Sequence, residues 1–270
     1  LSGQVSIRWI ENRMNTFINK ILKTENVDYV IASDTDSIYL NLGPLVEVIY
    51  KGREKNASSI VSFLNKICEM EFEKYIESSY ETLANYVNAY EQKMVMKREN
   101  IAERGIWTAK KRYILNVWDS EGVRYDEPKL KMMGIEAVKS STPAPCRTMI
   151  KDGLKLMMNG TEEDVIHFID DCRAKFKTLN PEDIAFPRTA SDVRKYKASS
   201  TIYAKGTPIH CRGALLFNHY IKKKQLDKKY SLISNGEKVK FIYLKKPNLI
   251  QENVISFIQD FPHELGLDKY

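Results

Sequence analysis

The sequence has few of the features that would assign it to a specialised class of protein. It contains only 12 Gly, 9 Pro and 4 Cys among 270 residues, and its apolar runs are shorter than the ~18 residues of a membrane span. The cysteines show no Cys-x-x-Cys spacing, which indicates reduced thiols that pack in the interior. These absences exclude a low-complexity, disordered or disulfide-rich protein. Since no secretory signal is visible either, we expect a soluble cytoplasmic protein without a membrane partner.

The positive charge is concentrated in one part of the chain. The 42 Lys and Arg exceed the 35 Asp and Glu and give a net charge of +7. Residues 188–229 hold eleven basic and two acidic residues, a local charge of +9, so the rest of the chain nets −2. Such an excess is typical of a surface that faces a polyanion, most often a phosphate backbone. The alternative is a solvated lysine-rich face.

The spacing of apolar residues predicts the elements of the first half. Residues 1–23 and 57–90 have helical patterns, the second with inward positions that run to Val87. Two short apolar runs, residues 29–32 and 37–40, predict a β-hairpin with Asp34-Thr35-Asp36 at its tip. Strands are also predicted at residues 93–96 and 112–118, with a return strand after a turn at residues 120–122. These strands can extend the sheet that the hairpin begins.

The composition changes at residues 140–143, and we therefore predict two domains, residues 1–139 and 140–270. Thr142 and Pro143 are suited to cap a helix that ends at Asn159-Gly160. Thr161 and Asp164 resemble the capping box of a second helix, with these inward residues: Val165, Phe168, Ile169, Cys172 and Phe176. Beyond it we expect irregular structure at residues 181–208, a helix at 213–224 and a strand at 239–244.

Asp34 and Asp36 are the strongest candidates for chemistry. Residues two apart in an extended chain point to the same side, and two close carboxylates repel each other unless a cation lies between them. Mg²⁺ suits such oxygen ligands, because it takes one or two protein carboxylates and completes its shell with water and substrate phosphates. The pair therefore suggests metal-assisted phosphoryl transfer. An ordinary acidic turn is the alternative interpretation.

Residues 30–39, Val-Ile-Ala-Ser-Asp-Thr-Asp-Ser-Ile-Tyr, resemble motif C of the family B (polymerase alpha-like) DNA polymerases. Lys110-Lys111-Arg112-Tyr113 resembles the Lys-x-Tyr motif of the same family. Three further segments are similar to the T-even-type phage branch: Lys97-Arg98-Glu99, Lys129-Leu130-Lys131 and Ser140-Ser141-Thr142-Pro143. The similarity extends over essentially the whole chain. One departure is Ala32-Ser33, where the family usually has Tyr-Gly.

The resemblance implies an α+β fold, with a palm of antiparallel sheet and long helices followed by a mostly helical, incomplete thumb. It implies two-metal-ion nucleotidyl transfer with Mg²⁺, for which Mn²⁺ can substitute, at the metal ligands Asp36 and Asp34, with Glu99 close by as a third catalytic residue. It also implies that primer-template DNA is bound by Lys110, Lys111, Arg112, Tyr113, Lys129, Lys131, Lys195, Tyr196, Lys205 and Arg212. The other partners are a deoxynucleoside triphosphate and, through a tail beyond Tyr270, a sliding clamp.

Two patterns of the family are missing from the chain: motif A, which supplies a bridging aspartate, and motif B, which holds the nucleotide. We therefore expect a split polymerase, whose N-terminal half carrying motifs A and B is another polypeptide, or a truncated reading frame. The isolated chain is predicted to be inactive.

Two other functions stay open. A non-catalytic module that binds duplex DNA would use the basic stretch and leave Asp34 and Asp36 idle. An Asp-x-Asp glycosyltransferase would use the carboxylates but leaves residues 110–113 and the basic stretch without a role.

Overall fold

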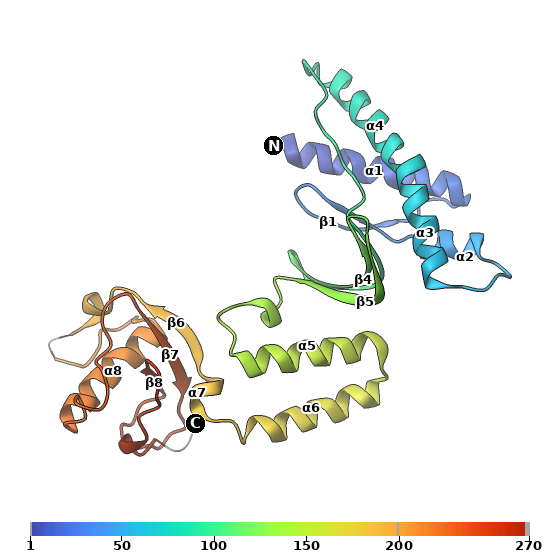
Figure 1. Ribbon diagram of the computed structural model, residues 1–270. Helices are drawn as coiled ribbons and strands as arrows, with labels where there is room; N and C mark the ends of the chain where they lie inside the picture. Colours follow the sequence, from blue (N-terminus) through green and yellow to red (C-terminus); the bar gives the residue numbers. More distant parts are fainter. Residues whose placement is uncertain (1, 199, 268–270) are drawn as a thin grey trace. The chain divides into compact units, whose positions relative to one another are not determined.

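The computed structural model describes residues 2–198 and 200–267, in two compact units, residues 1–133 and 134–270 (Figure 1). Helices and antiparallel sheets occur in both units, which confirms the predicted α+β class. The predicted boundary after Lys139, and the names palm and thumb, stay predictions, because compactness alone does not define a functional domain.

The described residues of the first unit form four α-helices and five strands. Its helices are α1 (Ser2–Leu22), α2 (Gly43–Ile49), α3 (Ala57–Ile67) and α4 (Glu73–Tyr86). Its strands are β1 (Val30–Ser33), β2 (Ile38–Leu40), β3 (Asn100–Ala109), β4 (Arg112–Ser120) and β5 (Val123–Met133).

Helix α1 is amphipathic, as its sequence predicts. Ile10, Met14 and Ile18 recur every four residues on one face and are buried. They pack in one cluster with residues of α4, and the rings of Phe17 and Tyr75 stack with their centroids 4.0 Å apart. The packing of α1 against α4 forms the main helical layer of the first unit.

The long helix predicted at residues 57–90 is confirmed only to Tyr86. It is interrupted by a π-helical segment, Cys68–Phe72, between α3 and α4. Val87 is 55 % exposed, so its expected inward position was wrong, and Tyr90 is fully exposed. The helix ends because Val87 and the following residues form a turn, in which Asn88 has a positive φ.

The strands of the first unit form two sheets instead of the single extended sheet that the sequence suggested. Strands β1 and β2 pair only with each other, and β3, β4 and β5 form a separate antiparallel sheet. The strand predicted at residues 93–96 is absent, while β3 was not predicted. A strand pattern becomes a strand only where a neighbouring strand completes its hydrogen bonds. No such neighbour pairs with residues 93–96 among the residues that the structure describes.

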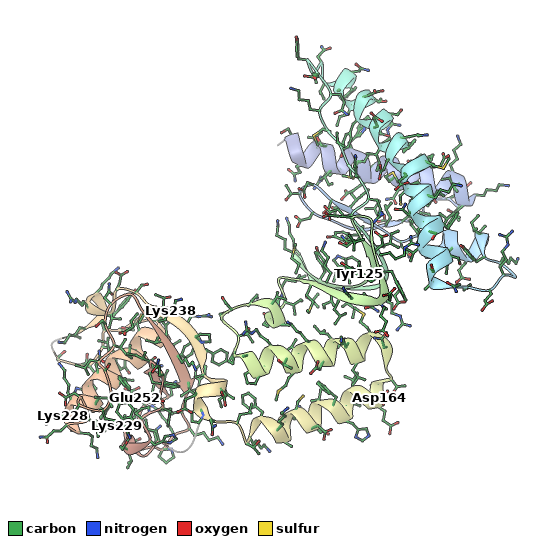
Figure 2. The ribbon with its side chains drawn as sticks, in the orientation of Figure 1. Tyr125, Asp164, Lys228, Lys229, Lys238 and Glu252 are labelled. Atoms are coloured by element: carbon green, nitrogen blue, oxygen red, sulfur yellow. The ribbon has the colours of Figure 1, made fainter. Side chains whose placement is uncertain are left out.

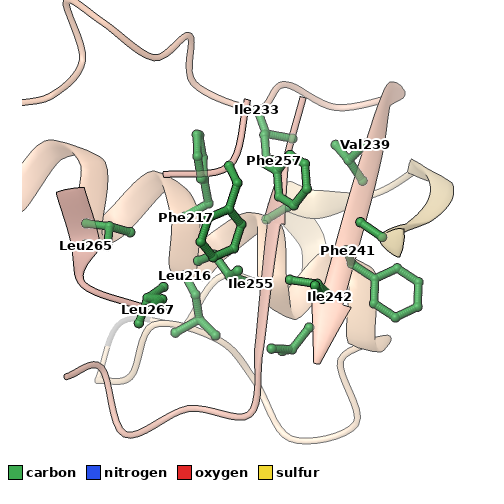
Figure 3. Close-up of a cluster of buried hydrophobic side chains, with 14 of the residues drawn as sticks. Leu216, Phe217, Ile233, Val239, Phe241, Ile242, Ile255, Phe257, Leu265 and Leu267 are labelled. Atoms are coloured by element: carbon green, nitrogen blue, oxygen red, sulfur yellow. The ribbon is translucent and has the colours of Figure 1, made fainter. Parts of the chain in front are cut away.

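The second unit contains α5 (Ala144–Asn159), α6 (Glu162–Phe176), α7 (Pro181–Ile184), α8 (Ile209–Lys223), β6 (Phe186–Ala190), β7 (Glu237–Tyr243) and β8 (Val254–Phe257). Strands β6, β7 and β8 form an antiparallel sheet in that order. Helix α8 packs on β8, where Leu216 and Phe217 meet Ile255 and Phe257 in a buried cluster (Figure 3). This cluster is the core of the second unit.

Several predictions for the second unit need correction. Helix α5 begins at Ala144 after Pro143 as its N-cap, so Thr142 does not cap it. Residues 181–208 are not irregular throughout, since they include α7 and β6, and α8 begins at Ile209 instead of Gly213. β7 confirms the predicted strand, whereas β6 and β8 were missed.

The capping box of α6 is confirmed, because the Thr161 hydroxyl accepts from the Asp164 backbone N–H and Asp164 accepts from the Thr161 N–H. The apolar side of α6 is not buried, however. Its five predicted inward residues line an open apolar groove with residues of α5.

All four cysteines are free thiols. Cys68 and Cys211 are buried, as expected for packing residues, and burial raises the pKa of Cys68 to about 11. Cys146 and Cys172 are only half-buried, and Cys172 lines the open groove. Among the described helices, none combines the length and hydropathy of a membrane span.

Candidate active site and nucleic-acid interface

The tip of the β1–β2 hairpin fixes one carboxylate and exposes the other. The Asp34 N–H donates to the Ser37 carbonyl at 2.8 Å and closes the turn. Asp34 Oδ1 accepts from the Thr35 N–H at 2.7 Å and from the Thr35 hydroxyl at 3.2 Å. Asp36 is exposed at the end of the hairpin. The turn therefore orients Asp34 and leaves Asp36 accessible.

Asp34 has a cationic partner from a distant part of the sequence. Lys111 Nζ lies 3.2 Å from Asp34 Oδ1, and the Asp34 side chain is 20 % exposed. The hydrogen bond from the Thr35 backbone and, after it, Lys111 hold the pKa of Asp34 below its usual value. The Asp34 carboxylate is therefore charged at neutral pH and partly neutralised by Lys111.

Lys111 belongs to the tight turn between β3 and β4. Ala109 pairs with Arg112, so Lys110 and Lys111 form the turn, and Lys111 adopts a left-handed backbone with φ of 59°. Both lysines are exposed. The turn presents two cations next to the carboxylate hairpin.

Three aromatic side chains connect the hairpin to the three-stranded sheet. Tyr39 of β2 lies with its ring centroid 5.3 Å from Trp107 and 5.4 Å from Tyr113. Burial, followed by a hydrogen bond with Tyr113, raises the pKa of Tyr39. Tyr113 is 6 % exposed. This aromatic contact packs the hairpin against strands β3 and β4.

Lys129 and Lys131 lie on the same face of the sheet as Tyr113. Lys129 pairs with Val117 and Lys131 with Leu115, and both partners alternate with Tyr113 along β4. Lys129 Nζ lies 4.1 Å from the ring centroid of Tyr125 (labelled in Figure 2), within cation–π range. The structure thus places Lys129 and Lys131 on the face of the sheet that carries Tyr113.

Glu99 is exposed at the end of the irregular segment that precedes β3. Its backbone carbonyl accepts from the Glu121 N–H at 2.6 Å, which ties it to the β4–β5 turn. Its negative charge adds to the raised pKa of Tyr39. Within residues 2–198 and 200–267, no group of three or more His, Cys, Asp or Glu side chains could hold a metal ion. Glu99 therefore does not complete a metal cluster with Asp34 and Asp36 in this chain.

A buried ion pair that was not predicted from the sequence anchors this region. Arg98 donates to Asp119, which is 2 % exposed, and also to Asn65 of α3. Asp119 accepts from the Gly122 N–H at 3.0 Å as well. The signal was an aspartate inside the apolar strand at residues 112–120. Because an unpaired buried charge is costly, such a residue indicates a cationic partner.

The candidate residues of the second unit gather at the N-terminal end of α8. The Ala204 N–H donates to the Tyr196 carbonyl at 2.9 Å, which brings Lys205 and Lys195 into one loop. Arg212 donates to Asn253 at 2.6 Å, and its guanidinium lies 5.5 Å from the ring centroid of Tyr203 in the same loop. Lys195 and Lys205 are exposed, whereas Tyr196 and Arg212 are half-buried.

The chain matches two phage polymerases along nearly its whole length. It is 34 % identical to a DNA-directed DNA polymerase of Escherichia phage RB69 over 263 residues, 94 % of this chain and 29 % of that protein. It is 31 % identical to a DNA-directed DNA polymerase of Enterobacteria phage T4 over 276 residues, 98 % of this chain and 30 % of that protein. The chain is similar to one portion of the T-even phage DNA polymerases. No protein-family model matches it.

These matches confirm the resemblance seen in the sequence motifs and support a DNA polymerase portion. The chain spans less than a third of the length of these relatives. Its catalytic and DNA-binding residues therefore stay predictions, which the geometry above makes specific.

Proposed function

We propose that the chain forms the palm and thumb of a DNA-directed DNA polymerase that acts in DNA replication. The Asp34–Lys111 ion pair is the observation that carries this proposal. It brings motif C and the Lys-x-Tyr motif into contact, although they are far apart in the sequence.

The donor set at the hairpin fits Mg²⁺ in part. Asp36 offers exposed carboxylate oxygens, and the three contacts of Asp34 described above converge on Oδ1. Mg²⁺ takes one or two protein carboxylates and otherwise binds water and substrate phosphates. When bound, it supplies electrostatic stabilisation of the phosphoryl group that is transferred. The bridging carboxylate of a two-ion site has to come from motif A, outside this chain.

The residues of the chain have distinct roles in this proposal. Asp36 holds the cation, and Asp34 orients Lys111 beside it, while Glu99 shapes the local field. The exposed Lys110 and Lys111 contact the primer strand, with Arg112 and Tyr113 behind them. Contacts with phosphates and the minor groove fix the position of the duplex without reading its sequence.

Other positive residues of both units bind the duplex as well. Lys129 and Lys131 lie on the sheet face next to Tyr113. The thumb contributes the loop at the N-terminal end of α8, with these residues: Lys195, Tyr196, Lys205 and Arg212. A polypeptide with motifs A and B supplies the site for the deoxynucleoside triphosphate.

Primer extension on a primed template with Mg²⁺ and nucleotides tests the proposal. The isolated chain is expected to bind the DNA and to extend no primer. Together with a polypeptide that carries motifs A and B, it is expected to synthesise DNA. Robust synthesis by the isolated chain would refute the prediction that synthesis requires motif A.

Asp36→Ala separates catalysis from binding. In the reconstituted polymerase this variant is expected to abolish synthesis. Its Kd for primed DNA is expected to change less than about twofold, because the negatively charged Asp36 does not form an ion pair with DNA phosphates. Lys111→Gln is the matched variant, expected to weaken primer binding equally for all sequences. Synthesis by the Asp36→Ala protein at the wild-type rate would favour the second candidate, a duplex-binding module without catalysis.

A further inference from the structure

The lysine-rich stretch divides into two groups at opposite ends of α8. The first group, at the N-terminal end, includes Lys205 and Arg212 and was described above. The second group lies at the C-terminal end, where the chain turns back because the Tyr230 N–H donates to the Leu226 carbonyl. We call this second group the lysine cluster: Lys222, Lys223, Lys224, Lys228 and Lys229. Ten residues of helix separate Arg212 from Lys222, a rise of about 15 Å.

The lysine cluster is exposed and has little acidic compensation. Lys229 forms an ion pair with Glu264. The other four lysines have no carboxylate of the described residues within ion-pair distance. Figure 2 shows Lys228 and Lys229 at the outer edge of the second unit. Two aromatic rings lie beneath the cluster, since Lys223 Nζ is 5.9 Å from the centroid of Tyr220 and Lys229 Nζ is 5.3 Å from that of Tyr230.

This concentration of charge is unfavourable for the isolated unit. Like charges close together repel and lower the stability of the folded state, and ordinary surfaces intersperse the two signs. A cation at a helix C-terminus is stabilised by the helix dipole, but only within the last turn. This stabilisation accounts for Lys222 and Lys223 and not for Lys228, which lies beyond the helix. A polyanion neutralises all of them.

The two ends of α8 share one exposed side. Arg212, His219 and Lys223 are spaced by seven and four residues, which places them on one face of a helix. His219 and Lys223 are exposed, and Arg212 is half-buried. One straight, rod-like polyanion can therefore run along this face from one end to the other.

We propose that the lysine cluster binds the phosphate backbone of duplex DNA at a second place, about 15 Å from the loop at the N-terminal end of α8. With one base pair per about 3.4 Å, the second contact falls about four to five base pairs farther along the duplex. This inference rests on the proposed function, because it takes the same DNA as its partner. The cluster lengthens the gripped stretch of duplex and adds to affinity without sequence preference.

The test compares three triple variants of the full chain by fluorescence anisotropy on a 20-base-pair primed duplex between about 50 and 200 mM salt. The first is Lys222→Gln/Lys223→Gln/Lys224→Gln. The matched control removes three exposed lysines of the first unit, Lys20→Gln/Lys51→Gln/Lys74→Gln. The conservative variant replaces Lys222, Lys223 and Lys224 with Arg.

The cluster variant is expected to bind about tenfold more weakly at 100 mM salt, and the slope of log K against log salt is expected to fall by up to about 2.7, since each phosphate contact contributes about 0.9. The control and the arginine variant are expected to keep the wild-type slope. In hydroxyl-radical footprinting, the cluster variant is expected to lose protection of the distal base pairs only.

Three results overturn parts of this reasoning in distinguishable ways. If the wild-type chain does not bind the duplex, both the proposed function and the second contact are wrong. If the wild type binds and the cluster variant matches the control, only the second contact is wrong, and the lysines face another partner, such as an acidic protein. If the cluster variant loses affinity with an unchanged footprint, the lysines act through their overall field and do not touch the backbone.

Discussion

The Arg98–Asp119 ion pair is expected to carry much of the stability of the first unit. The Arg98 side chain is 10 % exposed and that of Asp119 is 3 % exposed. Removing one partner of a buried pair costs about 3–5 kcal/mol, because the other charge stays buried without compensation. In Asp119→Ala, Arg98 keeps its contacts with Asn65 and the Glu99 carbonyl. We therefore expect the free energy of unfolding to fall by about 3 kcal/mol, the lower end of this range.

Urea denaturation followed by tryptophan fluorescence measures this effect without interference from the second unit. All three tryptophans, Trp9, Trp107 and Trp118, lie in the first unit. The midpoint is expected to fall without a change in the m-value, and Tm to fall by about 10 °C.

Two further variants separate the ion pair from general effects of mutation. Arg124→Gln is the control, because Arg124 Nε lies 3.9 Å from Asp119 Oδ2 and the side chain is 39 % exposed, so we expect a loss below about 1 kcal/mol. The double variant Arg98→Met/Asp119→Leu is expected to be more stable than Asp119→Ala, since it leaves no buried charge unpaired. An Asp119→Ala protein within about 1 kcal/mol of the wild type refutes the reasoning.

Two predictions concern the second unit. Hydrogen bonds from Lys229 and Tyr230 lower the pKa of Glu264 from 4.5 to about 2. The stabilisation of the folded state by this carboxylate is therefore present above pH 4.5 and is lost as the pH falls towards 2. Glu264→Gln is expected to flatten the dependence of folding stability on pH in that window, as measured by circular dichroism. Gly213→Ala is expected to destabilise the α8 packing by about 1–3 kcal/mol, because an added Cβ would lie 2.8 Å from the Ser256 backbone nitrogen; hydrogen exchange in β8 checks this, and unchanged protection contradicts it.

Local signals predicted the elements whose own residues specify them. Helix α1 follows from apolar residues every three to four positions, and the capping box of α6 from Thr161 and Asp164 alone. The β1–β2 hairpin follows from two apolar runs around an acidic turn. In each case the interactions that define the element lie within a few residues in the chain, so the sequence contains them directly.

Predictions that depended on distant partners were less successful. Residues 93–96 have a strand pattern but pair with no strand of the described residues. Strand β6 contains Pro187, which weakens a strand signal, although β7 completes its ladder. Asp119 inside an apolar strand indicates that a cationic partner is needed, but the sequence does not say that this partner is Arg98.

For the candidate site, the sequence by itself determined the chemistry that is available: two carboxylates at a hairpin tip, a run of cations at residues 110–112 and an excess of lysine between residues 188 and 229. Only the tertiary structure decided which of these groups meet. It placed Lys111 against Asp34 and Tyr39 against Tyr113, and it divided the lysines between the two ends of α8. The physical reason is that residue types fix charge and hydrogen-bonding capacity, whereas distances between remote residues are set by how sheets and helices pack.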